Sequence, residues 1–364
     1  MKTLSRRALN RATLDRQLLL RRAKMSAFDA VEHLAGLQAQ APFPPYFGLW
    51  SRLEGFRPAE LVELLESRRV VRIALMRGTV HLVTAADALA WRPVLQVLYD
   101  RDLKQNTLHA RALADLDHAE VASAARELLS VSALSSTALG AELARTWDVP
   151  PASLTHLARG RLPLVQVPPR AIWGKAGQTT YACLDEWVGA PLAPPSPASL
   201  ISRYLRAFGP ATVADVQTWA GITRLGEVAA AMDLRRYRDP DGRELLDLPE
   251  LTVPDEDVPA PPRLLGPFDQ MILSYADRTR IISDAYRKRV ISHNGLVKGT
   301  LLVDGRVCGF WEIKASRKAA AIELSPFEKL AKRDLAALEK SAGELVKWAE
   351  ATAETYEVRV DPAE

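Results

Sequence analysis

The chain has 364 residues, a length that favours two or three domains over one. Its 48% hydrophobic and 25% charged residues are typical of a globular protein, and no apolar run reaches the ~18–20 residues of a membrane span. The N-terminus interleaves Arg with Leu and lacks the apolar core of a signal peptide. Cys183 and Cys308 lie far apart, which argues against a disulfide framework or a cysteine-based zinc site. We therefore expect a reduced, cytoplasmic protein with no membrane partner.

The net charge of +4 is modest, but the charges are unevenly distributed along the chain. Residues 1–24 carry eight Lys/Arg and one Asp, whereas residues 239–258 carry eight Asp/Glu and one Arg. Residues 263–318 carry eleven basic and five acidic side chains. Such segregation predicts a directional field that can steer a polyanion. Basic side chains that merely solvate helix faces would give the same counts, so charge alone leaves both interpretations open.

Proline clusters divide the chain into segments that share one pattern of helices followed by strands. Proline disfavours helix at the preceding residue, so the clusters near residues 42–45, 150–151, 191–197 and 259–262 mark loops. In the first segment, helices are predicted at 26–38 and 58–68. The run RIALMRGTVHLVT follows them with strand character that is interrupted at Arg77-Gly78.

A second copy of the pattern runs from about 117 to 190. Ser136 is suited to cap a helix there, and the runs RLPLVQVPP and TTYACLDEWV supply strands.

The third copy begins at Ser199 and is the clearest. Thr212 is the expected N-cap of its second helix, Gly221 ends that helix, and a third helix follows to about Met232. The run TLLVDGRVCGFWEI predicts a hairpin about Asp304-Gly305. Three helices and a β-hairpin indicate a winged helix. A long C-terminal helix is expected to open at Ser325-Pro326, and YEVRV closes the chain as a strand.

These patterns predict an α+β fold of three tandem winged-helix domains with a C-terminal helix and strand. The expected boundaries are 1–115 for the first winged helix with an N-terminal basic helix, 116–194 for the second, 195–318 for the third with the β-hairpin, and 319–364 for the C-terminal element.

The most unusual local feature is Gln38-Ala39-Gln40, which precedes prolines 42, 44 and 45. Side chains at i and i+2 of an α-helix point ~200° apart, so two helical glutamines would diverge. If the helix ends near Leu37 or Gln38, both amides face one cavity and together orient a water beside a sugar or phosphate. The alternative is a pair of helix-end glutamines that only hydrogen-bond a neighbouring loop.

Several segments of the chain resemble the AlkZ/YcaQ family of bacterial DNA glycosylases. In chain order they are LAGLQAQAPFPPYFGLWSRL, IALMRGTVHLV, GPFDQMILSYADRTRII and GLVKGTLLVDGRVCGFWEIK. The resemblance covers about residues 5–360. Its specific mark is a Gln-aliphatic-Gln motif in the branch that resists crosslinking antibiotics, matched here by Gln38 and Gln40. The resemblance implies winged helices around a concave DNA-binding channel, removal of N7-alkylated purines, and no metal or cofactor. It implies catalytic roles for Gln38 and Gln40.

The chemistry can be judged from the substrate that the resemblance implies. Alkylation at N7 leaves guanine cationic, so the base departs as a neutral group without a general acid. Neutral amides can position the attacking water but are poor bases. No lysine lies near the motif in sequence, which argues against a Schiff-base lyase step. We expect a monofunctional glycosylase whose chemical step is nearly independent of pH between ~6 and 9.

Other residues are candidates for DNA contact. Arg77 and Thr79 are expected to face DNA, whereas His81 is interpreted as a hydrogen-bonded structural histidine. The hairpin 301–311 is a candidate for minor-groove insertion, with Arg306 beyond its tip, although an ordinary packed wing is the alternative. A phosphate-contact strip is expected in the third domain, where the alternative is a solvated face; it comprises Arg287, Lys288, Arg289, His293 and Lys298.

Two further groups are interpreted as structural. Trp50, Trp219 and Trp311 are expected in the core. The histidines show no metal-ligand spacing, so no metal site is expected.

The predicted function is therefore a monomeric bacterial DNA glycosylase, associated with the nucleoid, that acts on double-stranded DNA carrying N7-alkylpurine adducts or crosslinks. Unhooking of interstrand crosslinks and self-resistance to an alkylating antibiotic extend this prediction. The runner-up is a non-enzymatic winged-helix transcriptional regulator, and the third possibility is a protein-interaction scaffold. The segment Thr223–Met232 bears one Arg and one Glu, a poor match for reading base edges.

Overall fold

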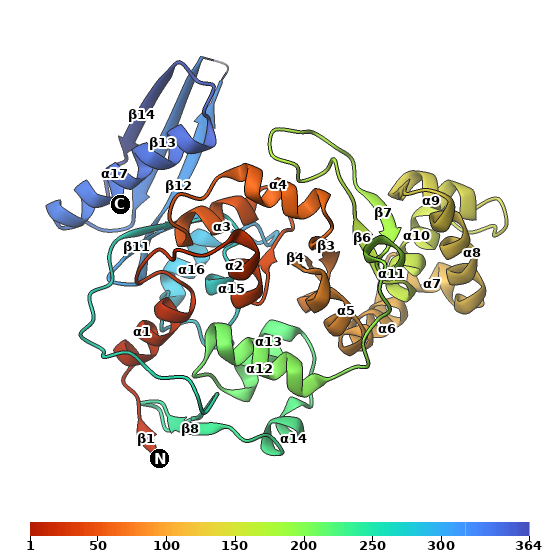
Figure 1. The fold of residues 1–364 in the computed structure, drawn as a ribbon, viewed down its shortest axis with the longest axis horizontal. Coiled ribbons are helices and arrows are strands. Elements are labelled where there is room, and N and C mark those ends of the chain that lie inside the picture. Colours follow the sequence, from red (N-terminus) through yellow and green to blue (C-terminus); the bar gives the residue numbers. More distant parts are fainter. Residues whose placement is uncertain (317, 364) are drawn as a thin grey trace.

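The computed structural model describes residues 1–316 and 318–363 and has the α+β architecture expected from the sequence (Figure 1). One element order, helix–strand–helix–helix–strand–strand, occurs in the first two units and, with its first strand reduced to a bridge, in the third. This is the order of a winged helix. The first unit contains α2 (Ala27–His33), β2 (Leu37–Gln38), α3 (Pro44–Arg52), α4 (Pro58–Glu66), β3 (Val70–Ala74) and β4 (Val80–Thr84). The one-turn 3-10 helix η1 (Met76–Gly78) joins β3 to β4.

The second and third units repeat this order. The second contains α8 (His118–Val131), β5 (Leu134–Ser135), α9 (Ser136–Leu143), α10 (Pro151–Arg161), β6 (Leu164–Gln166) and β7 (Thr180–Cys183). The third contains α12 (Pro197–Phe208), α13 (Val213–Ala220), α14 (Leu225–Ala230), β8 (Arg235–Arg238) and β9 (Glu244–Asp247). Its first strand is reduced to a bridge between Ala211 and Leu246. Helices connect the units: α5 (Ala85–Val94), α6 (Gln96–Gln105), α7 (Ala110–Leu113) and α11 (Leu184–Val188).

The wings of the first two units form one sheet. Its strand order is β2-β4-β3-β6-β7-β5, and β3 meets β6 where Arg72 pairs with Gln166. The sheet therefore crosses the expected boundary at residue 115.

A separate five-stranded sheet contains the hairpin that the sequence assigned to the third winged helix. Its strands are β10 (Arg263–Leu265), β11 (Gly299–Val303), β12 (Arg306–Ala315), β13 (Ala319–Pro326) and β14 (Thr355–Val360), and α17 (Lys332–Ala349) packs on it. The hairpin about Asp304-Gly305 is confirmed, with both residues at positive φ. The wing of the third unit, however, is β8–β9. The assignment of 301–311 to that unit is wrong because its strands extend the sheet of β10 and β13.

The C-terminal residues are part of the same sheet. Strands β12 and β13 pair over seven residues, so the expected boundary at 318 falls inside one hairpin. Ser325-Pro326 ends β13 rather than opening a helix, and α17 begins at Lys332. The closing strand YEVRV is confirmed as part of β14.

The N-terminal basic helix packs mainly against the third unit and the hairpin, and it meets the first unit where His33 Nε2 lies 2.8 Å from the Arg16 carbonyl oxygen. Helix α1 (Arg6–Arg16) follows β1 (Lys2–Thr3), which pairs in parallel with β8. Arg16 forms a buried ion pair with Asp247 at 2.7 Å, and Asn10 donates to the carbonyl of Gly305. The basic segment 1–24 and the acidic segment 239–258 therefore lie against each other.

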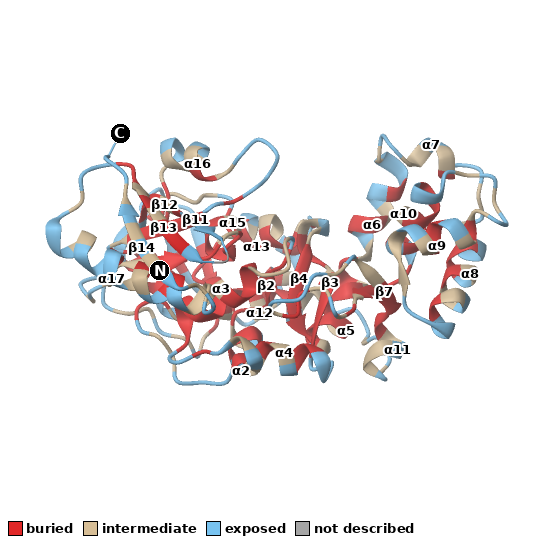
Figure 2. Cartoon of the chain, turned by 90° about the horizontal axis from the view of Figure 1, so that it is seen from above, coloured by how far each residue is buried: buried red, intermediate tan, exposed pale blue. Residues whose placement is uncertain are grey.

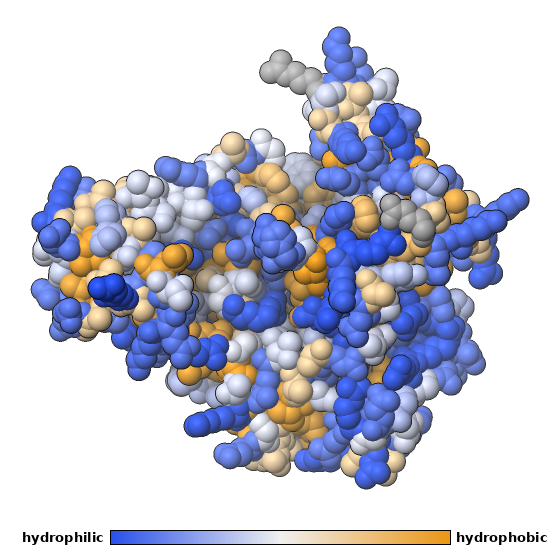
Figure 3. Space-filling view, turned by 180° about the vertical axis from the view of Figure 1, so that it is seen from behind, coloured by the Kyte–Doolittle hydropathy of each residue, from blue (hydrophilic) through white to orange (hydrophobic). Residues whose placement is uncertain are grey.

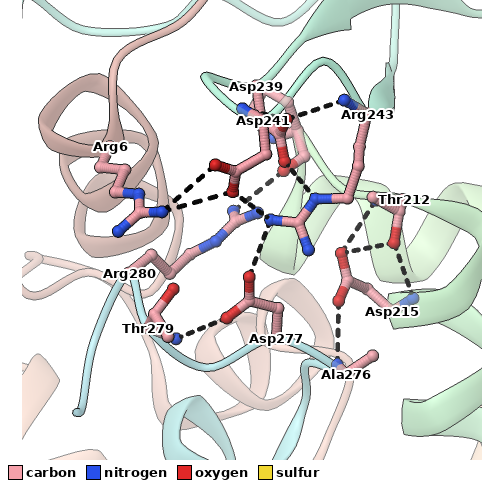
Figure 4. A network of polar contacts seen from close by, with 11 residues as sticks. Arg6, Thr212, Asp215, Asp239, Asp241, Arg243, Ala276, Asp277, Thr279 and Arg280 are labelled. Atoms are coloured by element: carbon pink, nitrogen blue, oxygen red, sulfur yellow. Dashed lines mark hydrogen bonds and ion pairs between the residues drawn. The ribbon is translucent and has the colours of Figure 1, made fainter.

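A further ion-pair network ties the third wing to the segment that follows α15 (Gln270–Leu273) (Figure 4). Arg243 contacts Asp239 at 2.6 Å and Asp277 at 2.7 Å, while Arg6 of α1 contacts Asp241 at 3.3 Å. Three segments far apart in sequence are joined at this point.

Two hydrophobic clusters connect the first unit to its neighbours. One cluster runs from its sheet through α5 to the third unit, and another runs from its helices to the five-stranded sheet. Trp50, Trp219 and Trp311 are buried, which confirms their assignment to the core. Buried residues concentrate in the middle of the molecule in Figure 2.

Helix α16 (Asp284–Val290) at one end, and α6 and α7 at the other, rise above the level of β2 and β4 in Figure 2. Hydrophilic side chains dominate the rear face in Figure 3, where hydrophobic groups form only small separate patches. Among the described residues, no helix combines the length and apolar character needed to span a bilayer.

Candidate functional site

The Gln38-Ala39-Gln40 segment is extended because α2 ends earlier than the sequence suggested. The helix stops at His33, and Ala35 and Gly36 both adopt positive φ, at 55° and 83°. A Cβ on Gly36 would lie 2.4 Å from Val83 Cγ1, so only glycine allows this close approach to β4. Gln38 then pairs with His81 in the sheet.

Gln38 and Gln40 are directed to the same turn. Side chains two residues apart on extended backbone share a face. The Oε1 atom of Gln38 accepts a hydrogen bond from Arg77 Nη2 at 2.8 Å, and Oε1 of Gln40 accepts one from the backbone N–H of Val80 at 3.1 Å. Arg77 lies in the β3–β4 connection, and Val80 is the first residue of β4. Gln38 is 8% exposed, whereas Gln40 is open to solvent.

The hydrogen-bond partners define the orientation of both amides. A guanidinium and a backbone N–H can only donate, so each must face the amide oxygen and not the NH₂ group. The Gln38 oxygen therefore points toward Arg77 in the β3–β4 connection, and the Gln40 oxygen points toward the start of β4. One lone pair on each oxygen is used there, which leaves the second for another donor.

Arg77 has a different environment from the one we predicted. Its Nη1 donates to the carbonyl of Trp219 at 2.7 Å while Nη2 holds Gln38, so both terminal nitrogens are engaged by the protein. Burial, together with the charge of Arg278, lowers the pKa of Arg77 to about 10. The expected role as a DNA contact is therefore revised. Thr79, half-buried beside it, donates its hydroxyl to Met76 and stays a predicted DNA contact.

A second arginine, which sequence reasoning missed, lies beneath the motif. Arg72 of β3 is 1% exposed and its Nη2 donates to the carbonyl of Ala39 at 2.8 Å. Burial, reinforced by Arg170, lowers the pKa of Arg72 to about 10, and its Nε and Nη1 are buried without a hydrogen-bond partner. The available signal was an arginine inside an otherwise apolar strand.

His81 is neutral at physiological pH. It is 1% exposed, and burial and the charge of Arg77 lower its pKa to about 3. Its Nδ1 lies 2.9 Å from the carbonyl of Thr79, as expected for a structural histidine. Among the described residues, the motif thus hydrogen-bonds to two arginines and the Val80 amide and pairs with a neutral histidine, and no carboxylate is among these partners.

A cavity of about 490 Å³ lies beside the motif. Arg77 and Gly78 contribute to its wall from the first unit, Arg159 contributes from the second, and Gly221 from the third. Gln38 and Gln40 do not line it. The cavity is therefore a neighbour of the motif, with Arg77 in contact with both.

The predicted phosphate strip lies on and after α16. Lys288, His293 and Lys298 are exposed, although Lys298 Nζ also lies 3.5 Å above the ring of Phe310. Arg287 forms an ion pair with Asp284, and Arg289 stacks on Phe327 at 4.1 Å. The strip stays a prediction, and its most accessible cations are the two lysines.

The hairpin tip does not have the freedom that minor-groove insertion requires. Asp304 is bonded to Arg7 at 2.6 Å and also to Arg11, while Gly305 packs on Asn10 of α1. A Cβ on Gly305 would lie 2.4 Å from Leu14 Cδ1. The insertion hypothesis is therefore corrected: the β11–β12 turn is a packing contact of α1. Arg306 beyond it is exposed and stays a predicted DNA contact.

One group of possible metal ligands among the described residues comprises Cys183, Asp185 and Glu186. Arg126 contacts both carboxylates, at 3.0 Å and 2.8 Å, and burial raises the pKa of the Cys183 thiol to about 11. Arg126 already pairs with both carboxylates and offsets one of their two charges, and the thiol stays protonated, so this donor set is a poor fit for a metal.

Comparison with known proteins gives a consistent result. The sequence matches the family described as DNA glycosylase AlkZ-like over residues 31–348. An interstrand DNA cross-link repair glycosylase from Streptomyces sahachiroi is 25% identical, and the alignment covers 92% of this chain and 94% of that protein. The solved structure of the Streptomyces sahachiroi DNA glycosylase AlkZ superposes with a TM-score of 0.76 at 22% identity, covering 99% of this chain and 100% of the other. The fold is therefore shared along the whole chain.

Proposed function

The chain belongs to the AlkZ-like DNA glycosylase family and is thus a hydrolase of N-glycosyl bonds in DNA, and we propose that its substrates are bulky N7-alkylated purines. The observation that carries the proposal is the pair of amides, Gln38 and Gln40, directed at Arg77 and the start of β4, with no acid or base of suitable pKa among the described residues that contact them. Such a site suits a base that needs no protonation in order to leave.

The proposed reaction follows from the charge of the substrate. An N7-alkylguanine is cationic, so the electron pair of the breaking C1′–N9 bond neutralises the departing base. Water adds to the oxocarbenium-like sugar at C1′, and the surplus proton passes to solvent. The remaining lone pair on Gln38 Oε1 accepts a hydrogen bond from that water, while Gln40 supports it or aligns its dipole with the sugar cation.

The same site suits a crosslinked substrate. A nucleotide tied to the opposite strand cannot be extruded fully into a closed pocket. Gln40 is exposed and neither glutamine lines the neighbouring cavity, which supports action on an unflipped base. The relative from Streptomyces sahachiroi is named for interstrand cross-link repair, which supports extending the proposal to crosslink unhooking. We extend it further to self-resistance against an alkylating antibiotic on the resemblance of Gln38 and Gln40 to the Gln-aliphatic-Gln motif.

The proposed substrate also suggests the oligomeric state, the cellular location and the cofactor requirement of the enzyme. We propose that the enzyme acts as a monomer on chromosomal duplex DNA in the cytoplasm and needs no metal or cofactor. The non-enzymatic regulator is not favoured, because the family is one of glycosylases. The short helix α14, six residues long, also offers little surface for reading bases.

The deciding experiment measures base release from a duplex containing a single N7-alkylguanine. We expect release by the wild type, and loss of ~10²-fold or more in the single-turnover rate for Gln38→Ala and Gln40→Ala, because each change removes a group that orients water. Gln178→Ala, at an exposed glutamine of the β6–β7 connection, serves as the matched control and should keep the wild-type rate.

Binding to the same duplex is measured in parallel for all four proteins. Glutamine variants that still bind the duplex but no longer release the base would support the catalytic assignment of Gln38 and Gln40. A wild type that binds the duplex without releasing the base would contradict the proposed substrate, and full activity in both glutamine variants would contradict the proposed site.

A further inference from the structure

Arg77 occupies an unusual position in the β3–β4 connection. Its backbone is left-handed, at φ 56° and ψ 17°, although it is not glycine. Such a conformation persists in a non-glycine residue only where the surroundings hold it. Here the αL residue Gly221 packs against it so closely that a Cβ on Gly221 would lie 2.8 Å from Arg77 Cα.

The guanidinium of Arg77 links two units of the fold. Nη2 donates to Gln38 Oε1 in the first unit, and Nη1 donates to the carbonyl of Trp219 near the C-terminus of α13 in the third. The last carbonyls of a helix have no intrahelical donor and carry the negative end of its dipole. The helix end is therefore a suitable anchor for a buried cation.

We propose, resting on the proposed function, that Arg77 is a positioning residue that holds the Gln38 amide in its reactive orientation, and that the third winged helix anchors it through the Trp219 carbonyl. The catalytic motif is then complete only when the first and third units are docked.

The energetic basis is the asymmetry of an amide. If Gln38 flipped by 180°, its NH₂ group would face a guanidinium, so two donors would meet and a buried cation would lose an acceptor. A hydrogen bond from a cation is also stronger than one between neutral groups. Arg77 therefore allows one orientation, in which the Gln38 oxygen is directed at the turn and retains a lone pair for water.

The alternative role is a phosphate contact, and the two roles predict different kinetics. A positioning residue affects the chemical step at saturating enzyme, whereas a phosphate contact affects affinity and its salt dependence. Arg77 is half-buried, and its two terminal nitrogens already have protein acceptors. These contacts favour the first role.

The experiment compares the wild type with Arg77→Met and Arg77→Lys on a duplex containing one N7-methylguanine. We expect Arg77→Met to lower the single-turnover rate at saturation by ~10- to 100-fold, with the Kd for the duplex unchanged within about twofold. Arg111→Ala, at an exposed arginine of α7, controls for the loss of one positive charge and should leave both values unchanged.

The pH dependence of the Arg77→Lys variant distinguishes a positioning role from a merely structural one, because a structural role would leave the pH profile flat. A buried lysine has a lowered pKa, so its hydrogen bond to Gln38 should weaken as rising pH removes the proton. We therefore expect partial activity in Arg77→Lys that falls with rising pH, against a flat profile for the wild type. A wild-type rate in Arg77→Met, or a rate loss cured by raising the enzyme concentration, would overturn the proposal.

Two further measurements keep the test independent of folding and of the substrate. Gly221→Ala leaves the guanidinium intact but displaces its backbone, and should also slow base release without weakening DNA binding. The NH₂ resonances of the Gln38 side chain, assigned by their loss in Gln38→Ala, should be sharp and single in wild type and broadened or averaged in Arg77→Met. If the wild type releases no base, the proposed function fails, but the Gln38 resonances still test the positioning role of Arg77. Resonances that are unchanged in Arg77→Met would refute that role.

Discussion

Arg72, Arg77 and His81 surround the glutamine pair, and the pKa of each lies well outside the physiological range. Burial lowers the pKa of both arginines to about 10, and burial together with the charge of Arg77 lowers that of His81 to about 3. The arginines lose a proton only as pH rises to about 10, and the histidine gains one only as pH falls to about 3. The charge of the site is therefore constant across the physiological range.

This constancy gives a prediction for the wild-type rate. The single-turnover rate constant for release of an N7-alkylguanine, measured at saturating enzyme, should vary by no more than about twofold between pH 6 and 9, because no contacting group titrates there. The measurement is a series of quenched time courses at constant ionic strength. A tenfold rise per pH unit through part of this range would instead reveal a titrating general base.

At the scale of single elements, the third wing is fastened by the Asp277–Arg243 contact shown in Figure 4. Burial alone would raise the pKa of Asp277, but hydrogen bonds from Thr279 and Arg243 outweigh it and lower the pKa to about 2. Since the unfolded value is about 3.9, the ionised carboxylate stabilises the fold above pH ~4. That contribution is lost as pH falls from about 4 to about 2.

The expected consequence is a pH-dependent effect of Asp277→Asn. The side chains of Arg243 and Asp277 are 47% and 34% exposed, so screening by solvent limits the contribution to about 1 kcal/mol. Urea unfolding should show that loss at pH 7 and a progressively smaller one toward pH 2. Asp233→Asn, at an exposed aspartate, is the control. An equal loss at pH 7 and pH 3 would show that the ion pair is not its cause.

At the scale of the whole molecule, two segments of opposite charge neutralise each other. The N-terminal segment contacts the acidic segment through Arg6–Asp241 and the buried Arg16–Asp247 pair. The field expected from residues 1–24 is therefore directed largely into the protein. The basic residues of segment 263–318, among them the exposed Lys288, remain the better candidates for phosphate contact.

A comparison of two cations tests this difference. Lys288→Ala should reduce the magnitude of the slope of log K against log salt by ~0.9, because one phosphate contact is lost. Arg6→Ala should leave the slope unchanged, because that arginine already faces Asp241. The measurement is the Kd for an undamaged duplex between 50 and 200 mM salt. Equal slopes in the two variants would contradict the assignment of the strip.

Local features were predictable from the sequence because they depend on neighbouring residues. The N-cap at Thr212 is confirmed, with a capping box to Asp215, and Gly221 ends the same helix at positive φ. The hairpin about Asp304-Gly305 formed as expected, and three tryptophans are buried. The Gln38-Ala39-Gln40 motif was likewise visible as a pattern.

Contacts between distant segments were decided only by the tertiary structure. Arg52 of α3 pairs with Asp269, 217 positions later in the sequence, and the predicted wing 301–311 joined another sheet. Gln38 is oriented by Arg77, and Arg77 by a carbonyl 142 positions later.

Capping, turns and hydrophobic periodicity are set within a few residues, so the chain by itself determined them. Other features depend on which distant surfaces pack together in one core. They include the sheet that the 301–311 hairpin joins, the carboxylate that pairs with a buried arginine, and the orientation of the Gln38 amide. Once these surfaces are buried, a polar group without a partner costs free energy, so each group must find one. Which partner is available is decided by the fold that brings the surfaces together.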